Sequence, residues 1–196
     1  MGALGTEEEP VVVGVTGASG APIAVRVLES LHRAEVPVAL IISAGGRAVV
    51  REECQMEASS LSQWASSTYS DGDLAAPVAS GSRRTRGMVV VPCSGNTVAK
   101  IALGFGDTLI ARAAQVHLKE QRRLIVVPRE TPLPVPLLRN LTTLAELGVV
   151  VLMAAPAYYT QPRTLEGQVD FLAGKVLDHL GVPHQLYRGW RSNEVT

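Results

Sequence analysis

An arginine and a glutamate stand side by side at the end of a short apolar run. Residues 124–127 are all apolar, and Pro128, Arg129 and Glu130 follow them. Such a run predicts a buried strand, and open α/β sheets bind their ligands beyond the carboxyl ends of their strands. There, an arginine can hold an anion and a carboxylate can hold or move a proton. We therefore expect chemistry at this end of the strand.

A glycine-rich turn near the start of the chain predicts a second polar site. The apolar run 11–15 leads into Thr16-Gly17-Ala18-Ser19-Gly20, which is typical of a strand, a tight turn and a helix start. Backbone amides at a helix start bind phosphate well, and the hydroxyls of Thr16 and Ser19 can add to them. The glycine spacing differs from G-x-G-x-x-G, and the acid that would hold a ribose is missing, so a dinucleotide is disfavoured. A tight turn capped by Ser19 is the alternative.

Small polar side chains also follow the apolar run 88–91. Ser94 and Thr97 stand where a strand would end and a helix begin, so three strand ends are expected to converge on one edge of the sheet. Cys93 is better interpreted as a buried structural cysteine than as a nucleophile, because no histidine lies near it in the sequence. Tyr158 and Tyr159 follow the last apolar run, and we expect at most one of them to contact a ligand at the same edge.

Cations on one predicted helix are candidates for binding an anion. Arg112 and Lys119 are seven residues apart, or two helical turns, and so share a face. A solvated basic face is the alternative, and it is the better interpretation for the arginines at 83, 84 and 86. No histidine falls at a predicted strand end, so a histidine general base is not expected.

The elements that must position these residues alternate regularly. Stretches with helical spacing lie between and after the apolar runs, and continuous Val, Ile and Leu runs are typical of a parallel sheet with helices on both faces. The predicted strands are 11–15, 36–42, 88–91, 124–127 and 149–153, and the predicted helices are 21–33, 45–56, 97–120, 135–147 and 164–180. Residues 57–87 break this alternation, and we interpret them as a functional lid or an interface arm, with a surface loop as the alternative.

Composition limits the classes of function. The 196 residues suit one domain, and 18 basic residues balance 18 acidic ones, so the positive field of a nucleic-acid or membrane-surface binder is missing. Charged residues make up only 18% of the chain and apolar ones 46%, which favours burial of surface between subunits. The two cysteines have neither disulfide nor metal-site spacing. No signal or membrane segment is recognisable, so we expect a cytoplasmic protein.

Six motifs in order resemble the UbiX flavin prenyltransferase family. A single one would be weak, whereas the ordered set, which spans about residues 10 to 190, is highly specific. The motifs are Thr16-Gly17-Ala18-Ser19-Gly20, Ala79-Ser80-Gly81-Ser82, Pro92-Cys93-Ser94, the stretch 109–120, Pro128-Arg129-Glu130-Thr131-Pro132 and the stretch 156–162.

The resemblance implies a fold and a reaction. The fold would be a flavodoxin-like (Rossmann-like) α/β three-layer sandwich with a mainly parallel sheet. Residues 1–10 would be a flexible N-terminal extension and 11–196 a single flavoprotein domain. The enzyme, a prenyltransferase, would join the dimethylallyl group of dimethylallyl phosphate to N5 and C6 of reduced FMN. Its product, prenylated FMN, would be the cofactor of a UbiD-type decarboxylase, and the site would be shared between subunits of a homododecamer. The absence of an aspartate-rich motif for magnesium diphosphate suits a monophosphate donor and chemistry without a metal.

The same resemblance assigns roles to individual residues. Catalysis would rest on Glu53, Lys119, Arg129 and Glu130, with the two glutamates as acid/base and orienting carboxylates. The departing phosphate gains negative charge, so cations aimed at it stabilise the transition state. Lys119, Arg129, Tyr159 and Lys175 would surround the prenyl phosphate, and FMN would be held by Gly17, Ala18, Ser19, Ser43, Ser94, Thr97 and Arg112.

Several positions depart from the family pattern. Ala44-Gly45-Gly46 stands where a lysine is usual, Thr160 where a histidine is usual, and Leu74 where a tryptophan is common. Lys175 replaces the usual arginine, which keeps the charge but loses the two-pronged guanidinium. These changes bear on phosphate affinity and prenyl selectivity more than on the class of reaction.

Two other functions remain open from the sequence. Pro92-x-Ser94-x-Asn96-Thr97 also resembles a motif of flavin-dependent decarboxylases that act on cysteine-containing substrates. Those enzymes carry a catalytic histidine after the second strand, whereas this chain has none between residues 33 and 116. A noncatalytic FMN-binding carrier would explain the changes at 74, 160 and 175, although Glu53 and Glu130 argue against it.

Overall fold

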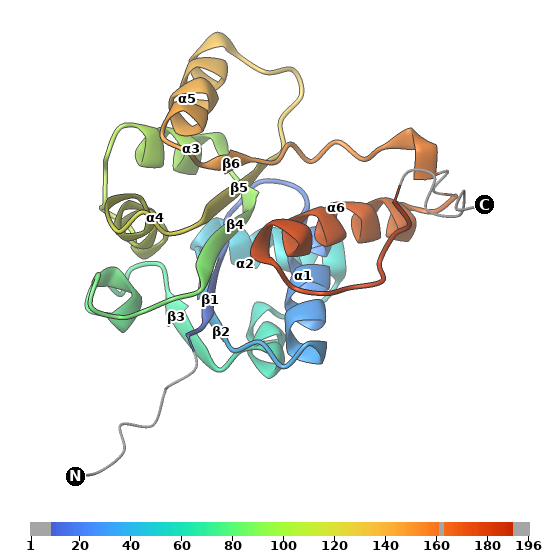
Figure 1. Ribbon diagram of the computed structural model, residues 1–196, viewed down its shortest axis with the longest axis horizontal. Helices are drawn as coiled ribbons and strands as arrows, with labels where there is room; N and C mark the ends of the chain where they lie inside the picture. The colour runs from blue at the N-terminus through green and yellow to red at the C-terminus, as the bar shows by residue number, and fades with distance from the viewer. Residues whose placement is uncertain (1–8, 161–162, 190–196) are drawn as a thin grey trace.

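The computed structural model of the protein describes residues 9–160 and 163–189. Within them, six strands form one sheet in the order β3-β2-β1-β4-β5-β6, and every pairing between neighbours is parallel (Figure 1). The strands are β1 (Val11–Val15), β2 (Val38–Ile42), β3 (Ser67–Ser70), β4 (Gly87–Cys93), β5 (Leu124–Pro128) and β6 (Val150–Val151). Most of the extension predicted over residues 1–10 lies outside the described residues.

The strand order reverses direction between β1 and β4. The chain moves from β1 to β2 and β3 on one side, and then crosses to β4, β5 and β6 on the other. Without the short edge strand β3, the order is that of flavodoxin, so the predicted flavodoxin-like sheet is confirmed. Such a reversal opens a crevice at the carboxyl ends of the two central strands, where ligands bind in open α/β folds.

Helices cover both faces of the sheet and complete a three-layer sandwich (Figure 1). Successive strand residues point to opposite faces, so Val13 packs with one layer and Val12 with the other. One layer contains α1 (Ala21–Arg33), α2 (Ala44–Cys54) and α6 (Leu165–Leu180), and the other contains α3 (Gly95–Ala102), α4 (Leu109–Lys119) and α5 (Val135–Glu146).

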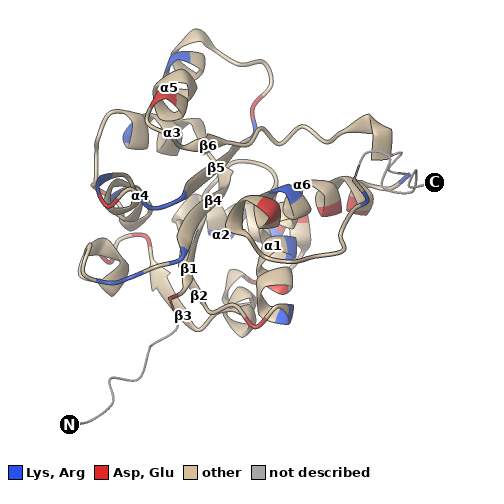
Figure 2. Ribbon diagram, viewed as in Figure 1, with Lys and Arg blue, Asp and Glu red and all other residues tan. Residues whose placement is uncertain are grey.

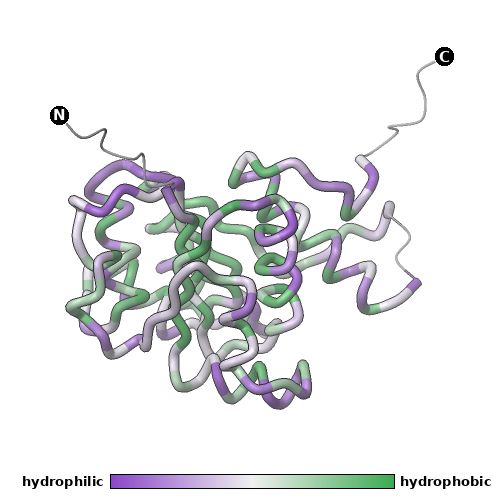
Figure 3. The backbone as a smooth tube through the Cα atoms, turned by 90° about the horizontal axis from the view of Figure 1, so that it is seen from below, coloured by the Kyte–Doolittle hydropathy of each residue, from purple (hydrophilic) through white to green (hydrophobic). Residues whose placement is uncertain are grey.

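The sequence of α1 shows why these helices form where they do. Pro22 stands in the first turn, where its missing N–H costs nothing, and the buried residues recur at helical spacing through Leu31. The strands contain no charged residue, and Figure 2 shows the charged positions on the helices and loops around the sheet. Figure 3 shows the same division as hydrophobic stretches running through the interior.

One sequence prediction about elements was wrong, and one strand was not predicted. The helix predicted over 97–120 is two helices, because the chain turns at Gly104 with a φ of 78° and α4 begins anew after Thr108. Residues 57–87 contain the 3₁₀ helices η1 (Ala58–Trp64) and η2 (Pro77–Ala79) and the unpredicted strand β3. Its Ser-Thr-Tyr-Ser sequence at the edge of the sheet has no apolar run to reveal it.

Candidate active site

Thr16 joins the loops that follow the two central strands. Its hydroxyl donates a hydrogen bond to the Pro92 carbonyl at 2.7 Å and accepts one from the Ser94 amide at 2.8 Å. The side chain is only 2% exposed, so its hydrogen-bonding capacity is used inside the protein. The expectation that the Thr16 hydroxyl would bind a ligand was therefore wrong. The predicted convergence of the loops after β1 and β4 is confirmed.

The loop after β1 also touches the start of α2. A Cβ atom on Gly17 would lie 3.0 Å from the Cα of Gly45, and one on Gly46 would lie 2.4 Å from the Val15 carbonyl oxygen. Side chains at these positions would force the start of α2 away from the end of β1 and the turn that follows it. The hydroxyl of Ser43 caps α2 by accepting a hydrogen bond from the Gly46 amide at 3.0 Å. The glycines at 45 and 46, which depart from the family pattern, therefore have a packing reason.

Ser94 and Thr97 place two hydroxyls at the start of α3. The Ser94 hydroxyl accepts a hydrogen bond from the Thr97 amide at 3.3 Å and lies 3.0 Å from the Thr97 hydroxyl. Both residues are half-buried beside the crevice at the carboxyl ends of β1 and β4. Ser19 is exposed in the loop after β1 on the same edge. The hydroxyls predicted to bind FMN are thus gathered at one edge of the sheet.

Arg112 lies on the first turn of α4, which Asp71 anchors to the end of β3. The Leu109 amide donates to the Asp71 carbonyl oxygen at 2.7 Å, and the Ile110 amide donates to the Asp71 carboxylate at 2.8 Å. The start of α4 is therefore at the carboxyl edge. The guanidinium of Arg112 is exposed and has no ion-pair or hydrogen-bond partner among residues 9–160 and 163–189. It remains available to an anion.

Glu53 reaches back from the end of α2 to the start of α1. One of its carboxylate oxygens accepts hydrogen bonds from the amides of Gly20 at 2.8 Å and Ala21 at 2.9 Å. These are orphan donors at a helix N-terminus, where a carboxylate is well placed. Glu53 thereby fixes the end of the glycine-rich turn. Asp71 and Thr16 were missed as anchors of the site, because nothing in the sequence indicates which distant backbone groups they meet.

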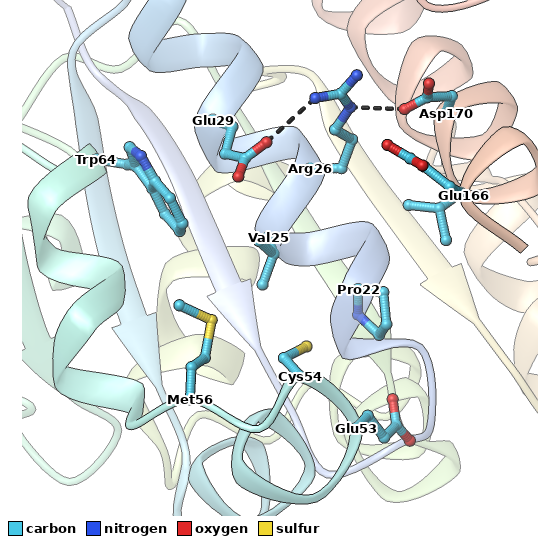
Figure 4. A pocket seen from close by; sticks show the side chains of 11 residues that line it. Pro22, Val25, Arg26, Glu29, Glu53, Cys54, Met56, Trp64, Glu166 and Asp170 are labelled. Atoms are coloured by element: carbon cyan, nitrogen blue, oxygen red, sulfur yellow. Dashed lines mark hydrogen bonds and ion pairs between the residues drawn. The ribbon is translucent and has the colours of Figure 1, made fainter.

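A cavity of about 360 Å³ opens beside Glu53, between α1, α2 and α6 (Figure 4). Arg26 spans its upper part, with its guanidinium 2.6 Å from the Asp170 carboxylate and 3.2 Å from that of Glu29. Trp64 and Met56 form an apolar side. The Arg26 guanidinium already has two carboxylate partners within the chain, whereas that of Arg112 has none among the described residues.

The chemistry of the crevice fits FMN. The backbone amides and hydroxyls of the turn can bind polar edges or a phosphate, the free guanidinium can pair with a phosphate, and the bare glycine backbone allows close approach. The residues that the family resemblance predicts to hold FMN are Gly17, Ala18, Ser19, Ser43, Ser94, Thr97 and Arg112. Cys93 is buried, and burial raises the pKa of its thiol far above the usual value. This burial confirms its interpretation as a structural cysteine.

Arg129 and Glu130 emerge from the carboxyl end of β5, as predicted. Both are exposed, and the Glu130 carboxylate accepts a hydrogen bond from the Thr131 amide at 3.1 Å. The guanidinium of Arg129 has no partner in the part of the chain that the structure describes. A second free arginine thus stands at the same edge of the sheet as Arg112.

Lys119 lies at the other end of α4. Just after it, the Arg122 guanidinium donates to the Gly81 and Arg83 carbonyls at 2.7 and 2.8 Å, in the segment that leads into β4. The Lys119 ammonium pairs with the Glu120 carboxylate at 2.6 Å, and this hydrogen bond lowers the pKa of Glu120. Lys119 therefore belongs to the amino edge of the sheet, and a single chain does not bring it to Arg129.

Tyr159 contacts α6, and Lys175 lies on that helix. The segment after β6 carries Tyr159 past the strand ends to α6, where its ring meets Phe171 edge-on with centroids 6.2 Å apart (Figure 1). Phe171 in turn meets Tyr187 at 5.0 Å, and the Lys175 ammonium lies 5.9 Å from the centre of the Tyr187 ring. Tyr159 thus packs against α6 through Phe171.

Within residues 9–160 and 163–189, no three His, Cys, Asp or Glu side chains gather as ligands of a metal ion. In the same ranges no helix combines the length and apolar character needed to cross a bilayer.

Comparisons with known proteins decide the family. A family model described as Flavoprotein matches residues 5–176. A relative from Thermoplasma acidophilum named Flavin prenyltransferase UbiX is 46% identical over 180 residues, which cover 92% of this chain and 99% of the relative. The chain belongs to the UbiX flavin prenyltransferase family.

Solved structures agree with membership of the UbiX family. A structure of AnUbiX in complex with FMN and dimethylallyl pyrophosphate is 38% identical, has a TM-score of 0.92, and covers 95% of this chain and 99% of its own. A dodecameric FMN-dependent UbiX-like decarboxylase from Escherichia coli is also 38% identical, with a TM-score of 0.91, and covers 93% of this chain and 100% of its own. The comparisons favour neither the cysteine-type decarboxylase nor the noncatalytic carrier.

Proposed function

We propose that this chain transfers the dimethylallyl group of dimethylallyl phosphate to N5 and C6 of reduced FMN and releases phosphate. The observation that carries the proposal is the likeness, at a TM-score of 0.92 over 95% of the chain, to a UbiX structure with FMN and dimethylallyl pyrophosphate. Two exposed arginines, Arg112 and Arg129, stand at the carboxyl edge without described partners. They fit the two phosphate groups of the reaction, one on FMN and one on the prenyl donor.

The cationic and acidic residues would have different roles in the reaction. Reduced FMN, when bound, supplies the electron-rich atoms that accept the prenyl carbon. Arg129 and Lys119 stabilise the negative charge that the phosphate gains as the bond between carbon and oxygen breaks. Glu130, beside Arg129, holds or moves a proton near that phosphate, and Glu53 does so beside the glycine-rich turn. Tyr159 and Lys175 complete the phosphate pocket from α6.

The separation of these residues supports a site shared between subunits. One chain presents Arg129 at the carboxyl edge, Lys119 at the amino edge and Lys175 on α6. Contacts between copies would bring the three cations to one phosphate, and the dodecameric relative is an assembly that offers such contacts. We therefore propose a homododecamer with composite sites.

Mass spectrometry of the released flavin tests the reaction. The purified protein is incubated anaerobically with reduced FMN and either dimethylallyl phosphate or dimethylallyl pyrophosphate. A gain of one prenyl unit that is lost in Lys119→Ala and in Glu130→Gln supports transfer by these residues. Greater product with the monophosphate supports the proposed donor. Unchanged FMN with both donors would contradict prenyl transfer and leave flavin binding as the function.

We also propose a recipient for the product, a cellular compartment and a domain organisation. Prenylated FMN would pass to a UbiD-type decarboxylase in the cytoplasm, and residues 11–196 would act as a single flavoprotein domain. Adding the product to an apo-decarboxylase of that type should restore decarboxylation. Failure with authentic reaction product would contradict this destination without affecting the transferase activity.

A further inference from the structure

The segment 182–188, here called the C-terminal strap, folds back across α6. It passes over Gly174, where a Cβ atom would lie 2.6 Å from the Tyr187 ring and 2.8 Å from the His184 ring. Glycine inside a helix weakens it, and at this position it lets two rings lie directly against the helix backbone. Val182 anchors the start of the strap in the core, where it is 3% exposed. The strap therefore packs directly against α6.

Asp178 is the point where the strap and α6 are joined. Its Oδ1 atom accepts a hydrogen bond from the His184 Nε2 at 3.1 Å. Its Oδ2 atom accepts one from the Lys175 ammonium at 3.0 Å and another from the Tyr187 hydroxyl. One carboxylate thus receives three donors, two of them from the strap and one from its own helix.

Backbone contacts define the direction of the hydrogen bond from His184. The Leu186 amide donates to the His184 Nδ1 at 3.2 Å, which makes that nitrogen an acceptor. The proton then lies on Nε2, facing Asp178. Burial works to raise the pKa of Asp178, but hydrogen bonds from Tyr187, Lys175 and His184 outweigh it and hold this pKa at about 2. The carboxylate stays charged, and its bond to Lys175 raises the pKa of that ammonium.

We propose that Asp178, held by Tyr187 and His184 of the strap, is a positioning residue that orients the Lys175 ammonium toward the prenyl phosphate. The inference rests on the proposed function, in which Lys175 meets that phosphate. An ammonium has three N–H donors, and contacts with Asp178 and Tyr187 leave at least one of them for the phosphate.

A lysine depends on such a positioning carboxylate more than an arginine does. The guanidinium is a rigid fork that meets a phosphate with two parallel hydrogen bonds, whereas the ammonium is a point charge on a flexible stem. Fixing the stem before the donor arrives lowers the entropy lost on binding. Here the Lys175 ammonium lies 5.9 Å from the centre of the Tyr187 ring and donates to Asp178, so the tip of the side chain is held from two sides. Replacement of Asp178 should therefore matter with a lysine at 175 and matter little with an arginine.

Calorimetric titration of FMN-loaded protein with dimethylallyl phosphate tests this coupling without requiring turnover. We expect Asp178→Asn to raise the Kd about tenfold, as is usual for loss of a hydrogen bond to a charged group. Tyr187→Phe keeps the ring and removes only the hydroxyl, and it should raise the Kd by a smaller factor. In a Lys175→Arg background, Asp178→Asn should change the Kd by less than about threefold, because the fork orients itself.

Asp170→Asn is the matched control. It removes a carboxylate from the same helix and breaks the Arg26 ion pair, yet it leaves the strap intact, so donor affinity should not change. Equal losses of affinity from Asp178→Asn in the lysine and arginine backgrounds would overturn the inference. So would wild-type affinity in Asp178→Asn when Lys175→Met binds weakly. If Lys175→Met itself binds normally, Lys175 does not meet the donor, and both the inference and that assigned role fail, while prenyl transfer is judged separately from the flavin mass.

Discussion

Lys119 and Arg129 lie at opposite edges of the same sheet, one before β5 and the other directly after it. The five residues of β5 span about 16 Å between them at the usual rise per residue. Arg122 holds the chain after Lys119 to the segment entering β4, and the Arg123 carbonyl accepts a hydrogen bond from the Met88 amide of β4, so the end of α4 stays at the amino edge. Since the proposed function assigns both cations to one phosphate, it requires them to come from different copies of the chain.

Mixed oligomers test that conclusion. Lys119→Ala and Arg129→Ala, each inactive alone, are coexpressed with different tags, and oligomers that carry both tags are purified. A site built from one chain's Arg129 and another's Lys119 has both residues intact in roughly a quarter of random pairings, so about that share of wild-type prenyl transfer should return. Product formation per bound FMN is the measurement.

A second mixture serves as the control for complementation. Arg129→Ala and Glu130→Gln alter neighbouring residues at the end of one strand, which enter the same site together. Mixing these two variants should restore no activity beyond that of each alone. Recovery in this mixture, or none in the first, would contradict a site shared in the proposed way.

Replacement of Glu53 separates its structural and chemical roles. Glu53→Ala leaves the amides of Gly20 and Ala21 without their acceptor, which should lower the free energy of unfolding by about 1–3 kcal/mol and weaken FMN binding. Glu53→Gln keeps an acceptor oxygen but has no ionisable group. We expect it to retain FMN and lose prenyl transfer, as measured by flavin fluorescence titration and product mass. Full activity in Glu53→Gln would rule out a proton-transfer role.

Removal of the Thr16 hydroxyl should weaken the link between the loops after β1 and β4 without changing the shape of the side chain. Thr16→Val is nearly isosteric but leaves the Ser94 amide without a partner, so we expect a loss of about 1–3 kcal/mol in unfolding free energy and a higher Kd for FMN. Urea unfolding and FMN titration measure the two effects. Thr16→Ser retains the hydroxyl and should lie close to wild type. Equal behaviour of the two variants would show that the bridge between the loops contributes nothing.

His117 should make the protein less stable in mild acid. Its ring lies between the Ala113 carbonyl at 2.7 Å and the Thr85 hydroxyl at 2.9 Å, and burial lowers its pKa from the usual 6.5. Below that value the unfolded chain binds a proton that the folded chain still refuses. The free energy of unfolding should therefore fall as the pH drops, by at most about 1.4 kcal/mol per pH unit for this group.

Urea unfolding between pH 8 and pH 5 measures this acid dependence. His117→Gln removes the titrating ring and should flatten the profile relative to wild type, although its own stability at pH 8 will be lower. His32→Gln alters an exposed histidine and should leave the slope as it is in wild type. A wild-type slope in His117→Gln would show that another group causes the acid sensitivity.

The sequence predicted the parallel sheet because its buried strands are continuous apolar runs, such as 11–15 and 124–127. The sequence analysis missed β3, because the polar sequence of this edge strand contains no apolar run. It also predicted α3 and α4 as one helix, because the apolar spacing continues across the break between them. Arg129 and Glu130 could be placed at a strand end from the run that precedes them. Arg112 could be placed only on a helix.

The sequence by itself determined the fold class, the family resemblance and the identities of the charged and hydroxyl groups, because these depend on local patterns along the chain. Only the tertiary structure decided which distant groups meet. It brought the Thr16 hydroxyl into hydrogen bonds with Pro92 and Ser94, and the Glu53 carboxylate into one with the Gly20 amide. It also linked Lys175 to the strap through Asp178. It also separated Lys119 from Arg129 by the length of β5. Hydrogen bonds over such sequence distances depend on packing in three dimensions, which no local pattern encodes.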